Sequence, residues 1–143
     1  LQSFENKKEW GLKVYFSPER VDSWLSQHIA DGPIVDEESS PGSAFLLKKQ
    51  RQTDLKTARK EKLNVWRDDI YTTLKAIDID MKVLKEVDQK LTGRHDQNLL
   101  NIAMLVSSDQ LSRIERALEE KRQMEDFGIA LELSGPWPPY SFV

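Results

Sequence analysis

The sequence contains no cysteine and only two histidines among its 143 residues. The absence of cysteine excludes disulfide bonds, thiolate catalysis and cysteine-ligated zinc sites together, and it fits a reducing compartment such as the cytoplasm. Two histidines without cysteine make a poor metal site. We therefore expect neither a metal ion nor any other cofactor.

Long apolar runs are also missing. No stretch approaches the roughly 20 consecutive apolar residues of a membrane-spanning helix, and no signal peptide is visible. The net charge is −3, so neither nucleic acid nor a membrane is expected to be the main partner. The chain opens with Leu1 instead of methionine, which we interpret as the mark of a fragment or a processed product.

Sequence signatures of catalysis are absent as well. The chain has no Walker glycine loop, no GxGxxG and no GxSxG. His28 lies on the predicted apolar stripe of a helix, which favours a core or boundary position, and His95 sits in a charged turn that predicts solvation. The SSPGSA stretch (39–44) could offer backbone N–H groups to an anion, but a plain loop is the favoured interpretation. We expect no enzyme.

Hydrophobic patterning at the start of the chain predicts a strand followed by a helix. In residues 9–16 the apolar side chains alternate, which is typical of a strand buried on one side. Ser17 and Pro18 then form a helix-start signal, and Gly32 and Pro33 form a stop signal. The acidic, Ser/Gly/Pro-rich residues 31–42 predict a mobile loop.

Residues 43–77 predict one long helix. Leu63, Trp66, Ile70, Leu74 and Ile77 recur at intervals of three and four residues. At about 1.5 Å per residue this helix would extend roughly 50 Å, which exceeds the width of a domain of this size. We therefore expect either a break in the helix or a helical arm that projects from the body.

The second half of the chain predicts strand, strand, helix, strand. Residues 79–91 favour a strand, 92–98 a turn, and the apolar run 99–106 a central strand buried on both faces. Ser107 and Gln110 have capping-box spacing and begin a helix that we place to about Glu125. Residues 128–133 alternate again and predict the last strand.

Without the long helix, the predicted order is βαββαβ. That order is the split-βαβ arrangement of ferredoxin-like folds. We therefore predict a single α+β domain over residues 1–143, with an antiparallel sheet, an inserted long helix and an ordered C-terminal tail at 134–143.

One segment departs from the overall negative charge. Residues 48–67 carry eight basic and two acidic side chains, a net charge of +6. A solvated helix face is the simplest interpretation, a docking surface for an acidic protein is the second, and nucleic acid is the third. The candidate docking residues are Lys48, Lys49, Arg51, Lys56, Arg59, Lys60 and Lys62.

The last eleven residues, LSGPWPPYSFV, are rich in proline and aromatic side chains. Proline fixes φ and removes a backbone donor, so this stiff segment cannot join the centre of a sheet and loses little entropy on ordering. Two interpretations stay open: the segment seals the domain's own core, or it occupies a partner's groove. The candidate interaction residues are Trp137, Pro138, Pro139, Tyr140 and Phe142.

Four stretches carry a resemblance to a known family. The tail ELSGPWPPYSFV (132–143) resembles the C-terminal signature of the gas vesicle accessory family GvpL/GvpF, and EWGLKVYF (9–16) resembles that family's EWG-containing strand. The segments GSAFLLKKQ (42–50) and NLLNIAMLV (98–106) resemble the start of its long helix and its buried strand. Family members usually carry another α+β domain before the EWG strand, so we expect this chain to correspond to the C-terminal portion.

The resemblance implies a non-enzymatic accessory role in gas vesicle assembly. Gas vesicles are gas-filled protein organelles that give microbial cells buoyancy. The implied partners are the shell protein GvpA and other accessory gas vesicle proteins, and the implied location is the gas vesicle in the cytoplasm. A general protein-interaction or regulatory domain unrelated to gas vesicles is the alternative.

Overall fold

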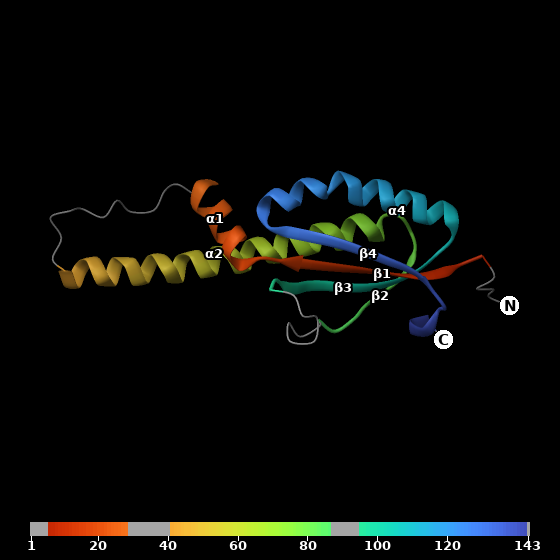
Figure 1. The fold of residues 1–143 in the computed structure, drawn as a ribbon, viewed down its shortest axis with the longest axis horizontal. Helices are drawn as coiled ribbons and strands as arrows, with labels where there is room; N and C mark the ends of the chain where they lie inside the picture. The colour runs from red at the N-terminus through yellow and green to blue at the C-terminus, as the bar shows by residue number, and fades with distance from the viewer. Residues whose placement is uncertain (1–5, 29–40, 87–94, 143) are drawn as a thin grey trace.

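Four antiparallel strands form one sheet in the order β2-β3-β1-β4 (Figure 1). The computed structural model describes residues 6–28, 41–86 and 95–142. Because β1 and β2 both pair antiparallel with β3, which lies between them, they run parallel to each other as a split βαβ unit. The predicted ferredoxin-like α+β fold is confirmed. The strands are β1 (Lys8–Phe16), β2 (Asp80–Val83), β3 (Gln97–Val106) and β4 (Ile129–Trp137).

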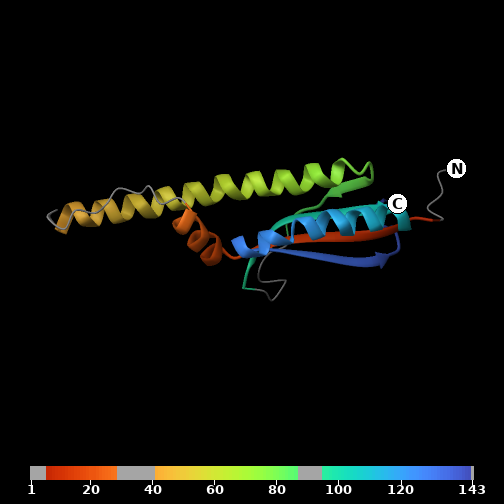
Figure 2. The ribbon, with the colours of Figure 1, turned by 90° about the horizontal axis from the view of Figure 1, so that it is seen from above.

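Helices cover one face of this sheet (Figures 1 and 2). The second half of the long helix and the helix before the last strand lie side by side on that face, while the first helix packs near one end of the sheet. The helices are α1 (Pro18–His28), α2 (Pro41–Lys75) and α4 (Ser108–Glu120), with short 3-10 helices η1 (Arg122–Phe127) and η2 (Tyr140–Phe142).

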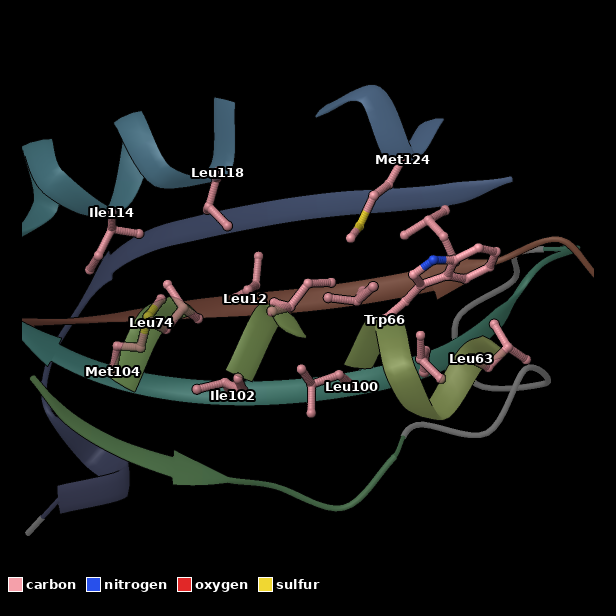
Figure 3. Packing of buried hydrophobic residues seen from close by; sticks show 14 of the residues in the cluster. Leu12, Leu63, Trp66, Leu74, Leu100, Ile102, Met104, Ile114, Leu118 and Met124 are labelled. Atoms are coloured by element: carbon pink, nitrogen blue, oxygen red, sulfur yellow. The ribbon is translucent and has the colours of Figure 1, made fainter. Parts of the chain in front are cut away.

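The core lies between the sheet and the helices (Figure 3). Leu12 of β1 pairs with Ile102 on one side and Leu133 on the other, and Leu12 and Ile102 are fully buried. Ile70 and Leu74 of α2 and Ile114 of α4 are likewise fully buried. The predicted burial of β3 from Leu99 to Val106 is confirmed. In β1, Leu12 and Val14 of the predicted core face are buried, but Tyr15 of the opposite face is buried too, so the prediction of a strand buried on one side holds only in part.

The long helix is unbroken and forms the predicted arm. α2 spans 35 residues, and its N-terminal half extends past the end of the sheet (Figure 2). Its C-terminal half is the helix that crosses over between β1 and β2, so the long helix supplies part of the helical layer itself. Gly42 already belongs to α2, and residues 31–40 of the predicted acidic loop lie outside the described residues.

The helix after β3 begins as predicted. Gln110 donates its backbone N–H to Ser107 Oγ (3.3 Å), and Ser107 donates its own backbone N–H to Gln110 Oε1 (2.9 Å). This capping box satisfies two of the N–H groups at the helix start. The helix ends at Glu120, earlier than the predicted Glu125, because the chain tightens into η1 before the left-handed Gly128 turns it into β4.

Two predictions on smaller elements are wrong. β2 is four residues long, shorter than the predicted 79–91, and residues 87–91 lie outside the described part. His28 is exposed at the end of α1, where its ring stacks on Trp24 at 4.3 Å between centroids. His28 is the last residue of α1, beyond the buried Val21 and Leu25, so its ring lies on Trp24 and is not enclosed by the core.

Candidate protein-interaction surfaces

The C-terminal strap (residues 134–142) begins inside the last strand. β4 continues to Trp137, which pairs with Glu9, so the strand enters the segment predicted as tail. The pairing is irregular between Glu9 and Gly11, and the Gly135–Pro136 peptide bond in this stretch is cis. β4 is an edge strand, so the backbone N–H that Pro136 lacks is not needed for pairing with a further strand.

After Trp137 the strap crosses the sheet face opposite the helices (Figure 1). Ser141 donates its backbone N–H to Glu9 Oε1 (2.7 Å) and its hydroxyl to Glu9 Oε2 (3.1 Å). Lys82 of β2 donates to the carbonyl oxygen of Ser141, and its Nζ lies 5.2 Å from the centroid of the Phe142 ring. Charged groups on β1 and β2 therefore anchor the strap by charge-assisted hydrogen bonds.

The EWG residues of β1 meet the strap at its start. A Cβ on Gly135, whose φ is +144°, would lie 2.8 Å from the ring of Trp10. A Cβ on Gly11 would lie 3.3 Å from Ser134 Oγ. The close approach explains the glycine at 135, because any larger residue there would push the strand and the strap apart, whereas at 11 the Ser134 hydroxyl would have to move only slightly.

The anchored strap leaves two aromatic side chains in solvent. Trp137 is 50% exposed and Tyr140 is 77% exposed, whereas Phe142 is half-buried. The predicted interaction residues therefore divide: Pro139 and Phe142 turn partly inward, and Trp137, Pro138 and Tyr140 turn outward. The strap packs on its own domain and also presents an aromatic surface.

The predicted basic residues divide in a similar way. Five of them are exposed along α2 between positions 48 and 60: Lys48, Lys49, Arg51, Lys56 and Lys60. Lys62 is half-buried, and Arg59 donates to Asp22 Oδ2 of α1 at 2.6 Å. Arg59 thus holds α1 against α2, and only the exposed group remains available to a partner.

Sequence reasoning missed the residues that anchor the strap. Glu9 and Trp10 lie in the EWG segment that carries the resemblance, so that segment held a signal for their role. Nothing in the sequence pointed to Lys82, because its contact with Ser141 joins residues 59 positions apart.

The described ranges offer neither a cluster of metal ligands nor a membrane-spanning helix. No three His, Asp or Glu side chains among these residues gather in a way that could hold a metal ion. None of the helices within the described residues combines the length and the apolar character needed to cross a membrane.

The comparison with protein families decides the identity of the chain. The sequence pattern of the family described as gas vesicle synthesis protein GvpL/GvpF matches residues 1–143. The chain belongs to the GvpL/GvpF family. The strap and the EWG segment, which carry the resemblance at opposite ends of the sequence, are thus direct neighbours in a GvpL/GvpF structure.

Two curated relatives and two solved structures are similar to this GvpL/GvpF chain. Gas vesicle protein L of a Streptomyces species is 25% identical over 142 residues, covering 99% of this chain and 50% of the relative. Gas vesicle protein L of Haloferax mediterranei is 23% identical over 152 residues, covering 99% of this chain and 45% of the relative. The chain spans about half the length of the curated relatives it matches.

The solved structures agree in fold. The crystal structure of gas vesicle protein GvpF from Anabaena matches with a TM-score of 0.58 at 14% identity, over 99% of this chain and 52% of that one. GvpF from Microcystis aeruginosa matches with a TM-score of 0.51 at 11% identity, over 97% of this chain and 55% of that one. At these identities the likeness shows the shared fold.

Proposed function

We propose that this chain is a non-enzymatic accessory component of gas vesicle assembly and that its C-terminal strap binds another gas vesicle protein, with the shell protein GvpA as first candidate. Membership of the GvpL/GvpF family supports the gas vesicle role. The exposure of Trp137 and Tyr140 on an anchored strap is the observation that supports the contact.

The large aromatic side chains and the ordered backbone of the strap both favour binding. An aromatic side chain buries about 150–250 Å² when it is fully covered, and Tyr and Trp also keep a polar group for hydrogen bonding. The backbone under Trp137 and Tyr140 is already held by Glu9 and Lys82. A partner therefore gains apolar burial with little loss of conformational entropy in the strap.

The proposal is tested by co-sedimentation of the 143-residue chain with purified gas vesicles and by pull-down with GvpA. We expect W137A/Y140A to bind at least tenfold more weakly, which corresponds to about 1.4 kcal/mol or more. Its melting temperature should fall only slightly, because both side chains are at least half exposed.

Phe45→Ala/Leu46→Ala is the matched control. These two side chains are 65% and 66% exposed at the far end of the arm, so their removal also deletes exposed apolar surface. The control should bind like wild type. Equal binding by W137A/Y140A would remove the strap from the proposal, and failure of the wild-type chain to bind any gas vesicle protein would favour an interaction domain of another kind.

A further inference from the structure

One face of α2 changes from apolar to polar where the helix extends past the sheet. Over the sheet this face buries Leu63, Trp66, Ile70 and Leu74 at intervals of three and four residues. Continued toward the N-terminus at the same spacing, it carries Lys60, Lys56, Gln52 and Lys49, all exposed. The helical face that is apolar over the body is thus polar and cationic along the arm.

A hollow of about 490 Å³ lies at the base of this arm. It is bounded by α2, by the end of β1 and by the start of β3, near the end of the core marked by Leu63 (Figure 3). Phe16, Leu63 and Leu99 supply its apolar lining. Lys56 and Lys60 of α2 also line the hollow, as does the acidic side chain Glu86.

The two lysines at the hollow have ammonium groups that can bind an anion. Lys56 and Lys60 are exposed, and neither takes part in an ion pair with another described residue. Arg59, which lies between them, is instead held by Asp22. The hollow therefore combines an apolar floor with two cations that have no ion-pair partner among the described residues, and Lys49 adds a third along the same face of the arm.

We propose that this hollow binds an acidic protein segment that carries a bulky apolar side chain. The apolar side chain occupies the space lined by Phe16 and Leu63, and flanking carboxylates pair with Lys56 and Lys60. The inference rests on the proposed function only in assigning the chain a protein partner, and it places the second contact far from the strap.

The positive charge suits carboxylates and phosphates alike, and the side-chain composition favours a protein segment over nucleic acid. The net charge of +6 over residues 48–67 complements a run of carboxylates. Between Leu46 and Val65, α2 carries no aromatic side chain on which bases could stack. Trp66 is only 7% exposed and stacks on Phe127 at 5.4 Å between centroids.

The test uses fluorescence anisotropy with the whole chain and three fluorescein-labelled peptides. The probe has two leucines flanked by glutamates, a second peptide has glutamine in place of glutamate, and a third has serine in place of leucine. We expect the probe to bind and each altered peptide to bind at least tenfold more weakly. Equal binding of the serine peptide, or no binding of the probe, would overturn the proposal.

Two variants and one control locate the binding. K56E/K60E should weaken binding of the probe at least tenfold. Thr57→Trp, which replaces an exposed side chain at the hollow with a large one, should weaken it without lowering the melting temperature. R113E/R116E makes the same charge change on exposed positions of α4 and should bind like wild type.

Loss of binding in R113E/R116E equal to that in K56E/K60E would reduce the effect to general electrostatic attraction and overturn the proposal. Displacement of the probe by a single-stranded oligonucleotide at physiological salt would favour nucleic acid instead. K56E/K60E should still co-sediment with gas vesicles, because its strap is unchanged. Co-sedimentation thus tests the strap and peptide anisotropy tests the hollow, so either proposal can fail without the other.

Discussion

At the scale of single residues, the position of the strap depends on its contacts with side chains of β1. Gly135 sits against the Trp10 ring with a positive φ, and Glu9 accepts two hydrogen bonds from Ser141. Each contact joins residues more than 120 positions apart in the sequence. The position of Trp137 and Tyr140 therefore follows from side chains at the beginning of the chain.

Gly135→Ala should destabilise the fold by about 1–3 kcal/mol, because it adds a methyl group in contact with Trp10 and holds a non-glycine residue at positive φ. Gly42→Ala is the control, since a Cβ there meets nothing within 4 Å and alanine favours the helix by up to about 1 kcal/mol. Urea denaturation measures both. A Gly135→Ala variant as stable as wild type would contradict the contact with Trp10.

At the scale of elements, the two halves of α2 differ in their surroundings. Its C-terminal half is fixed by the core, and its N-terminal half has exposed side chains. The boundary is held by an aromatic cluster in which Trp24 of α1 lies 5.6 Å from Trp66 and 4.6 Å from Phe127, measured between ring centroids. This cluster and the Arg59–Asp22 pair fix the direction of the arm at its base.

Ile70→Ala should cost about 2–5 kcal/mol of unfolding free energy, because Ile70 is fully buried and its loss leaves a cavity between α2 and the sheet. Leu46→Ala on the same helix should change stability by no more than about 0.5 kcal/mol, since Leu46 is 66% exposed. Chemical denaturation followed by circular dichroism compares the two. Similar losses in both variants would mean that the arm packs against something in solution.

At the scale of the whole molecule, the two proposed surfaces lie at opposite ends of β1. Glu9 holds the strap near one end of the strand, and Phe16 lines the hollow at the other. Seven residue-to-residue steps along the strand separate them, about 24 Å at roughly 3.4 Å per step. One chain can therefore hold two partners, or two parts of one partner, without overlap.

The two surfaces should act independently. Substitutions farther apart than about 10 Å without shared partners usually have additive effects within about 0.5 kcal/mol. Combining W137A/Y140A with K56E/K60E should thus leave each binding loss unchanged, when co-sedimentation with gas vesicles and anisotropy with the acidic peptide are measured side by side. A binding loss at one surface that changes when the other is altered would indicate coupling through the sheet.

Local patterning predicted much of the fold. The alternation in β1, the apolar run of β3, the three-and-four spacing in α2 and the capping box at Ser107 all depend on residues within a few positions of one another. Such patterns record which side of an element meets the core. They could not predict the short β2 or the exposed His28, because both depend on where a neighbouring element ends.

The sequence by itself determined the element types, their order, the length of the long helical segment and the stiffness of the last residues, since each follows from periodicity, capping and proline chemistry, whereas it left open whether that segment breaks or projects as an arm. Only the tertiary structure decided that Glu9, Trp10 and Lys82 hold the strap, that Trp137 and Tyr140 face solvent, and that Lys56 and Lys60 stand beside a hollow. The physical reason is that strand register and helix crossing bring together residues whose spacing along the chain carries no periodic signal.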